Sequence, residues 1–402
     1  MNLSHIVSSA AAIRLRQRLV PEGGPTDKVF PPTFAGGVYC WEQRRLEGKS
    51  VPCVLLDSVA SQANRLEEAI AEAIDAHQIK VPRLVVSFDG VLADIGEIST
   101  LAAPHRIFDA IFRDSSIEGT PFFRSPLYRK LTACNVRNAT ALFAHAPTAL
   151  LFGCWDSTGA AGGMGNKFAR AVTSEIVGIN AEWGSTRGGV RQDPLSIKSD
   201  VEIAIDKAGD WSVVGRSEGG KKERAKGTRP SEINHGNVLV KVETGDNERI
   251  VGDKIITQSL PLKGGVTIDY ALQTTVLSLT ALRRLRFPLA DASSSHRDVA
   301  ARNVLAALGL VGVTVARDRG CWLRSRCGLV ADGLQQLEVV SPDGTTSPLD
   351  MDTKLAVETY NQSIIEATNA GLPWASEPIV LQPQPKLVEL ILRSREIQSL
   401  GD

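Results

Sequence analysis

The segment IRLRQRLV, Ile13 to Val20, decides the expected fold because its apolar and charged side chains alternate. In a β-strand this period of two sorts the side chains onto opposite faces, with Ile13, Leu15 and Leu19 on one and Arg14, Arg16 and Arg18 on the other. The segment therefore predicts a sheet that is buried on one side and carries a row of arginines on the other. A solvated sheet face that binds nothing has the same pattern and remains the alternative.

A similar alternation returns late in the chain, in CWLRSRCGLV, Cys321 to Val330. Taken as one strand, it divides into Trp322, Arg324 and Arg326 on one face and Leu323, Cys327 and Leu329 on the other. In a ferredoxin-like βαββαβ sheet the first and last strands are neighbours. We therefore predict an α+β fold in which the five arginines of the two segments form one basic surface around Trp322. Such a surface suits single-stranded nucleic acid, with a solvated face again as the alternative.

The elements between these segments are predicted from apolar spacing. VPCVLLDS, Val51 to Ser58, is expected to be a strand, and the helix that follows is expected to have Ser61 as its N-cap. Residues 267–287 have the spacing of a helix that ends in arginines. A further helix over about residues 297–308 is expected to end at Gly309, before a strand over residues 311–317.

Composition and charge exclude several classes of protein. The chain has 402 residues, of which 43% are hydrophobic and 22% charged, as in globular proteins. Its 45 basic and 45 acidic residues balance, so any site for nucleic acid must be local. The six cysteines form no C-x-x-C pair and the six histidines form no metal-binding motif. We expect a cytoplasmic protein with no secretory signal, no membrane partner, no metal and no cofactor.

The glycine-rich stretch FGCWDSTGAAGGMGNKFARAVTSEIVGIN, Phe152 to Asn180, suggests a phosphate-binding loop at first sight. A Walker motif requires Lys directly after its last Gly and then Ser or Thr. Here Asn166 separates Gly165 from Lys167, and Phe168 follows. The Walker interpretation fails, and no strand with G-x-G-x-x-G indicates a dinucleotide site.

The segment GRSEG, Gly215 to Gly219, matches the nucleophile elbow of a hydrolase around Ser217. Asp291 and His296 follow in the chain order of such a triad. The elbow needs a helix directly after it, and GKKERAKGTRP has no apolar face with which to pack on a sheet. A serine hydrolase is kept as an alternative function.

Residues from about 181 to 265 differ in character from the rest of the chain. Short strand-like pieces flank a glycine-rich loop without apolar periodicity. The basic residues of this loop are Lys221, Lys222, Arg224, Lys226 and Arg229. We predict a mobile basic loop on an insertion that projects from the main domain.

Five blocks of sequence together resemble one family. They are LLDSVASQANRLEEA, PHRIFDAIFRDS, ALLFGCWDSTGAAGGMGNKFARAVTSEIVGIN, SEINHGN and AARNVLAALGLVGVTVARDRGCWLRSRCGLV. In this order, from about residue 13 to residue 330, they resemble the backbone subunit of the type I-G (formerly I-U) CRISPR surveillance complex, a RAMP-superfamily protein of the Cascade backbone group. The tail after about Asp332 resembles it more loosely.

The resemblance implies a single RRM-like palm over residues 1–402 with inserted finger and thumb segments. Residues 181–265 would be the thumb-like insertion and residues 332–402 a C-terminal extension. Copies of the protein would polymerise along the spacer of a guide RNA, which pairs with target DNA. Other Cascade subunits and a separate helicase-nuclease would be further partners. The aromatic RNP motifs of common RRM domains are missing, so readout by base stacking is not expected.

The resemblance also implies roles for individual residues. Guide-RNA contacts are expected at Asn64, Arg65, His105, Arg106, Lys167 and Arg170, each with a surface or core-capping role as its alternative. Asn64 and Arg65 are expected at a helix start, where backbone amides suit a phosphate. The 221–229 loop is expected to be the thumb or a target-DNA contact, with a disordered spacer as its alternative.

The same resemblance implies that the protein is not an enzyme. Related backbone subunits of type III complexes cut target RNA with a loop aspartate, and Asp156 is the tempting equivalent here. Because Asp156 lies within a block typical of the DNA-targeting branch, we expect no nuclease activity. An RNA-cleaving subunit that uses Asp156 is the remaining alternative.

Overall fold

The structure is a computed structural model of the 402-residue chain. It describes residues 3–156, 167–184, 189–206, 209–214, 228–240, 244–251, 254–261, 264–289, 294–333 and 336–401.

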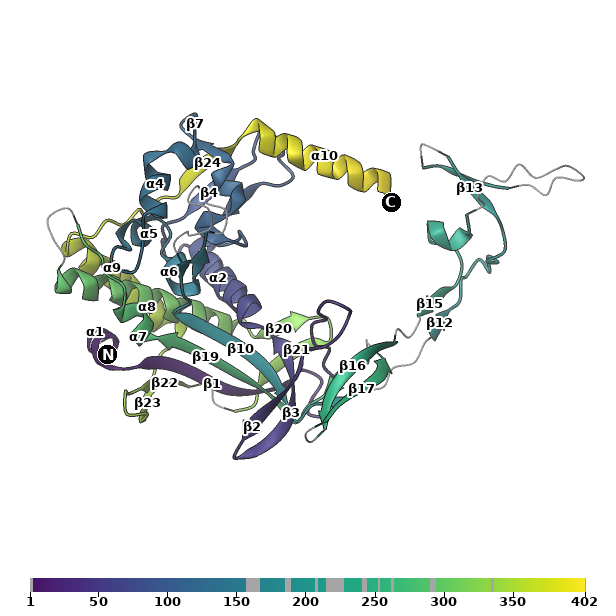
Figure 1. Cartoon of the computed structure of the whole chain (residues 1–402), viewed down its shortest axis with the longest axis horizontal. Helices are drawn as coiled ribbons and strands as arrows, with labels where there is room; N and C mark the ends of the chain where they lie inside the picture. The colour runs from purple at the N-terminus through teal and green to yellow at the C-terminus, as the bar shows by residue number, and fades with distance from the viewer. Residues whose placement is uncertain are drawn as a thin grey trace, which may run out of the picture.

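A nine-stranded antiparallel sheet forms the base of the molecule and curls along its length (Figure 1). Its main path runs β2-β3-β10-β19-β1-β21-β20, and β22 pairs with both β1 and β23. The strands are β1 (Ala12–Pro21), β2 (Trp41–Leu46), β3 (Lys49–Asp57), β10 (Val172–Ile179), β19 (Tyr270–Ser278), β20 (Cys321–Arg324), β21 (Cys327–Ala331), β22 (Leu337–Val340) and β23 (Thr346–Leu349). The predicted first strand is confirmed, and it does lie beside strands from the end of the chain.

Helices cover one face of this sheet (Figure 1). The helix α2 (Val59–Asp75) buries Leu66, Ala69 and Ile70 on the side that meets the sheet and α8. Its N-cap is Ser58, whose hydroxyl accepts a hydrogen bond from the Ser61 backbone amide at 3.2 Å. The prediction of Ser61 as N-cap was therefore wrong by one turn.

The helix α8 (Ser295–Asp318) is the centre of the core, with an almost continuous run of buried residues from Ala300 to Val315. Its length and apolar composition would suit a membrane span, yet 89% of its most apolar window is buried inside the fold. The predicted stop at Gly309 and the predicted strand after it were wrong. Gly309 and Gly312 bring the helix close to its neighbours: a Cβ at Gly312 would lie 3.3 Å from the Ile70 side chain.

The helix predicted over residues 267–287 is mainly the strand β19, and only α7 (Leu279–Arg283) is helical. The β-branched run Thr274, Thr275 and Val276 fits a central strand, and pairing on both sides with β1 and β10 overrides the helical spacing.

The segment Cys321–Val330 was predicted as one strand and is instead a hairpin of β20 and β21. Arg326 stands at its turn with a φ of 58°, in the left-handed region. The turn reverses the chain, so the side chains on the two sides of it do not continue one alternating pattern.

A second, smaller sheet lies on the far side of the helices (Figure 1). Its order is β5-β4-β24-β6-β7, with β4 (Leu84–Ser87), β5 (Glu97–Ser99), β6 (Ser115–Ile117), β7 (Thr120–Pro121) and β24 (Ile379–Pro383). The remaining helices are α1 (Leu3–Ser9), α3 (Ala110–Arg113), α4 (Pro126–Thr132), α5 (Thr140–His145), α6 (Thr148–Phe152), α9 (Thr353–Asn369) and α10 (Pro385–Gly401), with 3-10 turns at Arg106–Phe108, Phe122–Arg124 and Pro230–Ile233. The expected C-terminal extension thus supplies strands to both sheets and the helix α9, which packs on α8.

The chain between β10 and β19 leaves the main body as a series of two-stranded ribbons (Figure 1). The ribbons pair β11 (Glu182–Trp183) with β18 (Val266–Thr267), β16 (Thr244–Val251) with β17 (Lys254–Pro261), β12 (Gly189–Arg191) with β15 (Val238–Val240), and β13 (Ile203–Ile205) with β14 (Trp211–Val213). A further short ribbon pairs β8 (Cys154–Trp155) with β9 (Lys167–Phe168) at the glycine-rich stretch.

Candidate nucleic-acid interface

The arginine row of β1 lies on the sheet face opposite α2 and α8. Arg14 pairs with Glu338 of β22 at 2.6 Å, and Arg18 lies over the Tyr270 ring with its guanidinium carbon 3.9 Å from the ring centroid. Arg18 also approaches Asp332 at 3.5 Å. Arg16 is exposed and forms no ion pair with the residues that the structure describes. Arg16 and Arg18 are therefore the members of the row best placed to meet an external anion.

The row continues sideways across the sheet. Thr274 stands opposite Arg16 on one side and opposite Glu175 on the other. Glu175 is held by Arg44 of β2 through two hydrogen bonds of 2.6 and 3.0 Å, which raise the pKa of that arginine. Since Arg44 neutralises the carboxylate, the acid does not cancel the charge of Arg16. Arg44 was missed from the sequence because its strand shows no clear alternation.

Arg324 and Arg326 do not join this row, so the single basic surface predicted from the two segments was wrong. The guanidinium of Arg324 turns inward, where it donates to the backbone oxygens of Phe30 and Leu56 at 3.3 and 3.0 Å. Arg326 stacks over the Phe30 ring, 4.5 Å from its centroid. The reason is the hairpin turn, which places both residues at the other end of the sheet.

Asp57, at the end of β3, holds a cluster of donors although its side chain is only 1% exposed. It accepts from Gln62 at 2.7 Å, from Arg65 at 3.0 Å and from Arg324 at 3.4 Å. Arg65 also donates to the backbone oxygens of Trp322 and Leu323, which ties α2 to β20. The guanidinium of Arg65 thus has protein partners on every side, and it lies in the second turn of α2 rather than at its start.

Arg106 is buried, which argues against the predicted surface contact with RNA. It forms a two-bond ion pair with Glu67 of α2, each bond 2.7 Å long, and donates to the Gly153 carbonyl at 3.1 Å. Burial raises the pKa of Glu67 to about 7 against the opposing effect of Arg106 and Arg170. Arg106 also holds a φ of 52°, an unusual backbone angle that this pair and its burial maintain.

The other predicted contacts are spread over the surface. Asn64 is exposed on α2, His105 is exposed before the 3-10 turn at Arg106–Phe108, and Arg170 is exposed just after β9. Lys167 pairs its backbone with Trp155 in the β8–β9 ribbon. Arg170 is near enough to Glu67 to affect its charge, so it belongs to the neighbourhood of the Arg106 pair.

Several predicted residues lie outside the described part of the chain. These are Ser217, Lys221, Lys222, Arg224, Lys226 and Asp291. Arg229 directly precedes the 3-10 turn at Pro230–Ile233, and His296 is exposed in the first turn of α8. Asp156 is only 7% exposed after β8, and the residues that follow it, 157–166, are not described.

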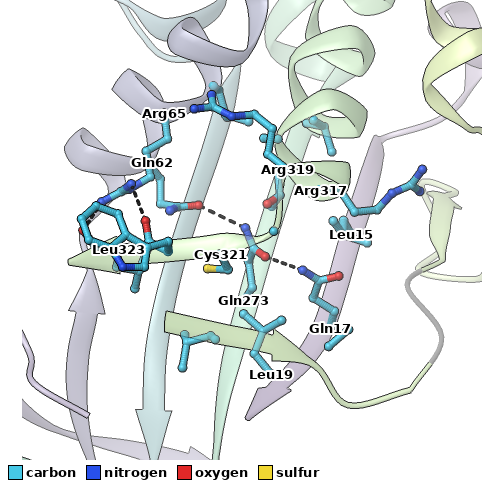
Figure 2. A pocket seen from close by; sticks show the side chains of 18 of the residues that line it. Leu15, Gln17, Leu19, Gln62, Arg65, Gln273, Arg317, Arg319, Cys321 and Leu323 are labelled. Atoms are coloured by element: carbon cyan, nitrogen blue, oxygen red, sulfur yellow. Dashed lines mark hydrogen bonds between the residues drawn. The ribbon is translucent and has the colours of Figure 1, made fainter. Parts of the chain in front are cut away.

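A cavity of about 570 Å³ opens between the main sheet and the helices α2 and α8 (Figure 2). Its sheet wall includes Gln17 of β1 and Gln273 of β19, and its helix wall includes Gln62 and Arg65 of α2. Three glutamines form a chain in which Gln17 donates to Gln273 and Gln273 donates to Gln62 at 3.1 Å. Gln62 then donates to Asp57, so the chain ends in the cluster described above.

The comparison with known families adds a direct observation at this point. Residues 13–183 match the family described as CRISPR-associated protein GSU0053. The match begins at Ile13 in β1 and ends at Trp183 in β11, and it includes Asp57, Gln62, Arg65 and Arg106. No curated protein matches the chain.

The similarity to a CRISPR-associated family implies a role in CRISPR defence. It confirms the CRISPR part of the resemblance over residues 13–183. The matched segment carries the arginine row, the Asp57 cluster and the buried Arg106 pair.

Among the residues that the structure describes, no group of three or more His, Cys, Asp or Glu side chains is placed to hold a metal ion. The six cysteines are not joined in disulfides.

Sequence reasoning missed the glutamine chain, although one signal was present. Gln17 stands at an apolar position of the alternation that places Ile13, Leu15 and Leu19 inward, and it is 6% exposed. A polar residue in an apolar series marks a buried hydrogen-bonding group, and such groups are found with partners. Gln273 and Gln62 become recognisable only once the strands and α2 are placed together.

Proposed function

We propose that this protein is the guide-RNA-binding backbone subunit of a type I-G Cascade complex. Several copies would polymerise along the spacer of the guide RNA and present it for pairing with target DNA. The observation that carries the proposal is the match of residues 13–183 to a CRISPR-associated family, which begins at the strand with the arginine row.

The sheet topology supports an RRM-like palm. In the order β10-β19-β1-β22, the strand that follows α2 lies at one side, and the strand that follows α8 pairs with β1. This is the strand order of a ferredoxin-like βαββαβ unit with β3 added at its edge. The ribbons between β10 and β19 would then be the thumb-like insertion.

The distribution of charge supports contact with a nucleic-acid backbone. The net charge of the chain is zero, yet Arg16 and Arg18 stand on an open sheet face with Arg44 beside them. A subunit that must accept any spacer needs contacts to phosphate and sugar, which carry no sequence information. A short local row supplies such contacts without making the whole surface basic.

The further parts of the proposal follow from this role. The protein would act in the cytoplasm, without catalytic activity, beside other Cascade subunits. Cleavage of the target would be left to a separate helicase-nuclease.

The test is to express the chain together with a guide-encoding array and to analyse the nucleic acid that purifies with it. We expect a discrete guide RNA that is protected from nuclease at regular intervals, in particles that hold several copies of the protein. Expression without the array is the control, and it should give no such RNA. Purification of a monomer without RNA in the presence of the array would contradict the proposal.

A further inference from the structure

The direction of the hydrogen bonds along the glutamine chain is set by Asp57. A carboxylate only accepts here, because Arg65 donates to the same oxygen as Gln62. Gln62 must therefore present its NH₂ group to Asp57 and its carbonyl to Gln273. Gln273 in turn must present its carbonyl to Gln17.

The hydroxyl groups beside the chain agree with this direction. Ser174 donates to the Gln62 carbonyl at 2.7 Å, and Thr275 is 2.7 Å from the Ser174 oxygen. Since Ser174 uses its proton on Gln62, Thr275 must supply the proton of the second bond. The Gln62 carbonyl thus receives two donors and has no capacity left for the far end of the chain.

The consequence is an unused acceptor at the inner wall of the cavity. The Oε1 atom of Gln17 is buried and has no hydrogen-bond partner among the described residues. The residue itself is 94% enclosed, being 6% exposed. Leaving a buried carbonyl unpaired is unfavourable, so a ligand that brings an N–H or O–H donor gains from this position.

The outer part of the cavity has a different character. The indole of Trp322 lines it and is 65% exposed, a large aromatic surface at the rim. The arginines nearby are already paired: Arg317 with Asp318 at 3.1 Å and Arg319 with Glu72 at 3.0 Å. The cavity therefore offers an aromatic face and a neutral acceptor, rather than a site built for an anion.

We propose that this cavity binds a single nucleobase, with the base edge donating to Gln17 Oε1 and the ring against Trp322. Each of the four standard bases carries an N–H donor, so one acceptor admits all of them. The volume of about 570 Å³ lies within the range of ordinary small-ligand pockets. The base comes either from the bound guide RNA, which rests on the proposed function, or from a free nucleotide, which does not.

The first arm of the test uses the full chain purified without an array. Adenosine, guanosine, cytidine and uridine, with their 5′-monophosphates, are titrated by calorimetry, and ribose 5-phosphate is the control ligand without a base. We expect binding of nucleosides and none of ribose 5-phosphate. Binding of ribose 5-phosphate as tight as that of the nucleotides would overturn the proposal, since it would indicate an anion site.

The second arm uses the particle that purifies with guide RNA. Ultraviolet crosslinking followed by peptide mass spectrometry is expected to join a nucleotide to the peptide that contains Trp322. A crosslink without nucleoside binding in the first arm assigns the base to the guide, and nucleoside binding without a crosslink assigns it to a free nucleotide. If RNA purifies with the protein but neither signal is found, the nucleobase site is refuted while the RNA-binding function stands.

Two variants connect either signal to the cavity. Trp322→Ala changes an exposed side chain and should weaken base binding by about tenfold or more, as loss of a stacking partner does. Gln17→Met removes the acceptor at similar size and should give a comparable loss, with its fold checked by circular dichroism. Phe123→Ala, which removes a 37%-exposed ring outside the cavity, is the matched control and should bind as the wild type does. Unchanged binding in Trp322→Ala would refute the proposed site even if Gln17→Met failed to fold.

Discussion

The two faces of the sheet use arginine in opposite ways. On the helix-covered side, Arg65, Arg106 and Arg324 have carboxylate and carbonyl partners inside the protein. On the open side, Arg16 has no ion-pair partner among the described residues and Arg18 has a distant one, at 3.5 Å. Both kinds of arginine look alike in the sequence. The number of acceptors around a guanidinium, and not its presence in a motif, separates a structural arginine from one available to a ligand.

The largest effect is expected where a covered arginine is removed. Arg106→Met leaves the buried Glu67 carboxylate without a partner and should lower the free energy of unfolding by about 3–5 kcal/mol above pH 7. The measurement is chemical denaturation at pH 8 and at pH 5.5.

The pH dependence identifies the cause of that loss. Burial raises the pKa of Glu67 from 4.5 to about 7. The folded protein then keeps a proton that the unfolded chain releases between these values, so the contribution of Glu67 to stability falls as the pH rises through this window. The loss in Arg106→Met should therefore be smaller at pH 5.5 than at pH 8. Equal losses at both pH values would show that repacking, not charge, is responsible, and Glu67→Gln with Arg106→Met should recover part of the loss at pH 8.

A middle effect is expected at the packing that closes the covered face. A Cβ at Gly312 would lie 3.3 Å from both the Ile70 side chain and the Leu66 carbonyl, which is tight for two neighbours on α2. Gly312→Ala should cost about 1–3 kcal/mol of unfolding free energy. Gly309→Ala is the matched control, because its nearest contact would be an ordinary 3.4 Å from Leu277. A variant at Gly309 that is as unstable as the one at Gly312 would contradict the close approach of α8 to α2.

The smallest effect on stability is expected on the open face. Replacing both Arg16 and Arg18 with Ala should change the free energy of unfolding by no more than about 0.5 kcal/mol, as surface substitutions do. If these residues contact phosphates, the double variant should bind guide RNA more weakly, and the slope of log affinity against log salt should become shallower by about 1.4. Arg393→Ala, on the exposed part of α10, is the control. An unchanged salt slope in the double variant would remove the row from the RNA interface.

The sequence allowed the strand β1, the helix α2 and the α+β class to be predicted, because alternation and helical spacing report burial directly. It failed at α8, where Gly309 looks like a helix end and in fact permits close packing. It failed also at β20 and β21, since a two-residue turn at Ser325 and Arg326 keeps the apparent alternation intact while reversing the chain.

The candidate site was predictable only in part. Arg14, Arg16 and Arg18 follow from a local pattern, and the structure places them on the expected face. Arg106 and Arg324 were misassigned because their acceptors, Glu67 and Asp57, come from distant segments. The glutamine chain joins three elements, and its direction depends on a carboxylate on a fourth.

The position of β1 in the sheet has a consequence for how the chain is made. Its residues leave the ribosome first, yet Ile13 pairs with Leu277 and Val339. At about 5–20 residues per second, on the order of ten to fifty seconds pass before the first of these partners is synthesised. During that time the apolar side of β1 has neither its neighbouring strands nor α8 to cover it. Folding of the main sheet must therefore be largely post-translational, and the early strand depends on chaperones or on its own arginines to remain soluble while it waits.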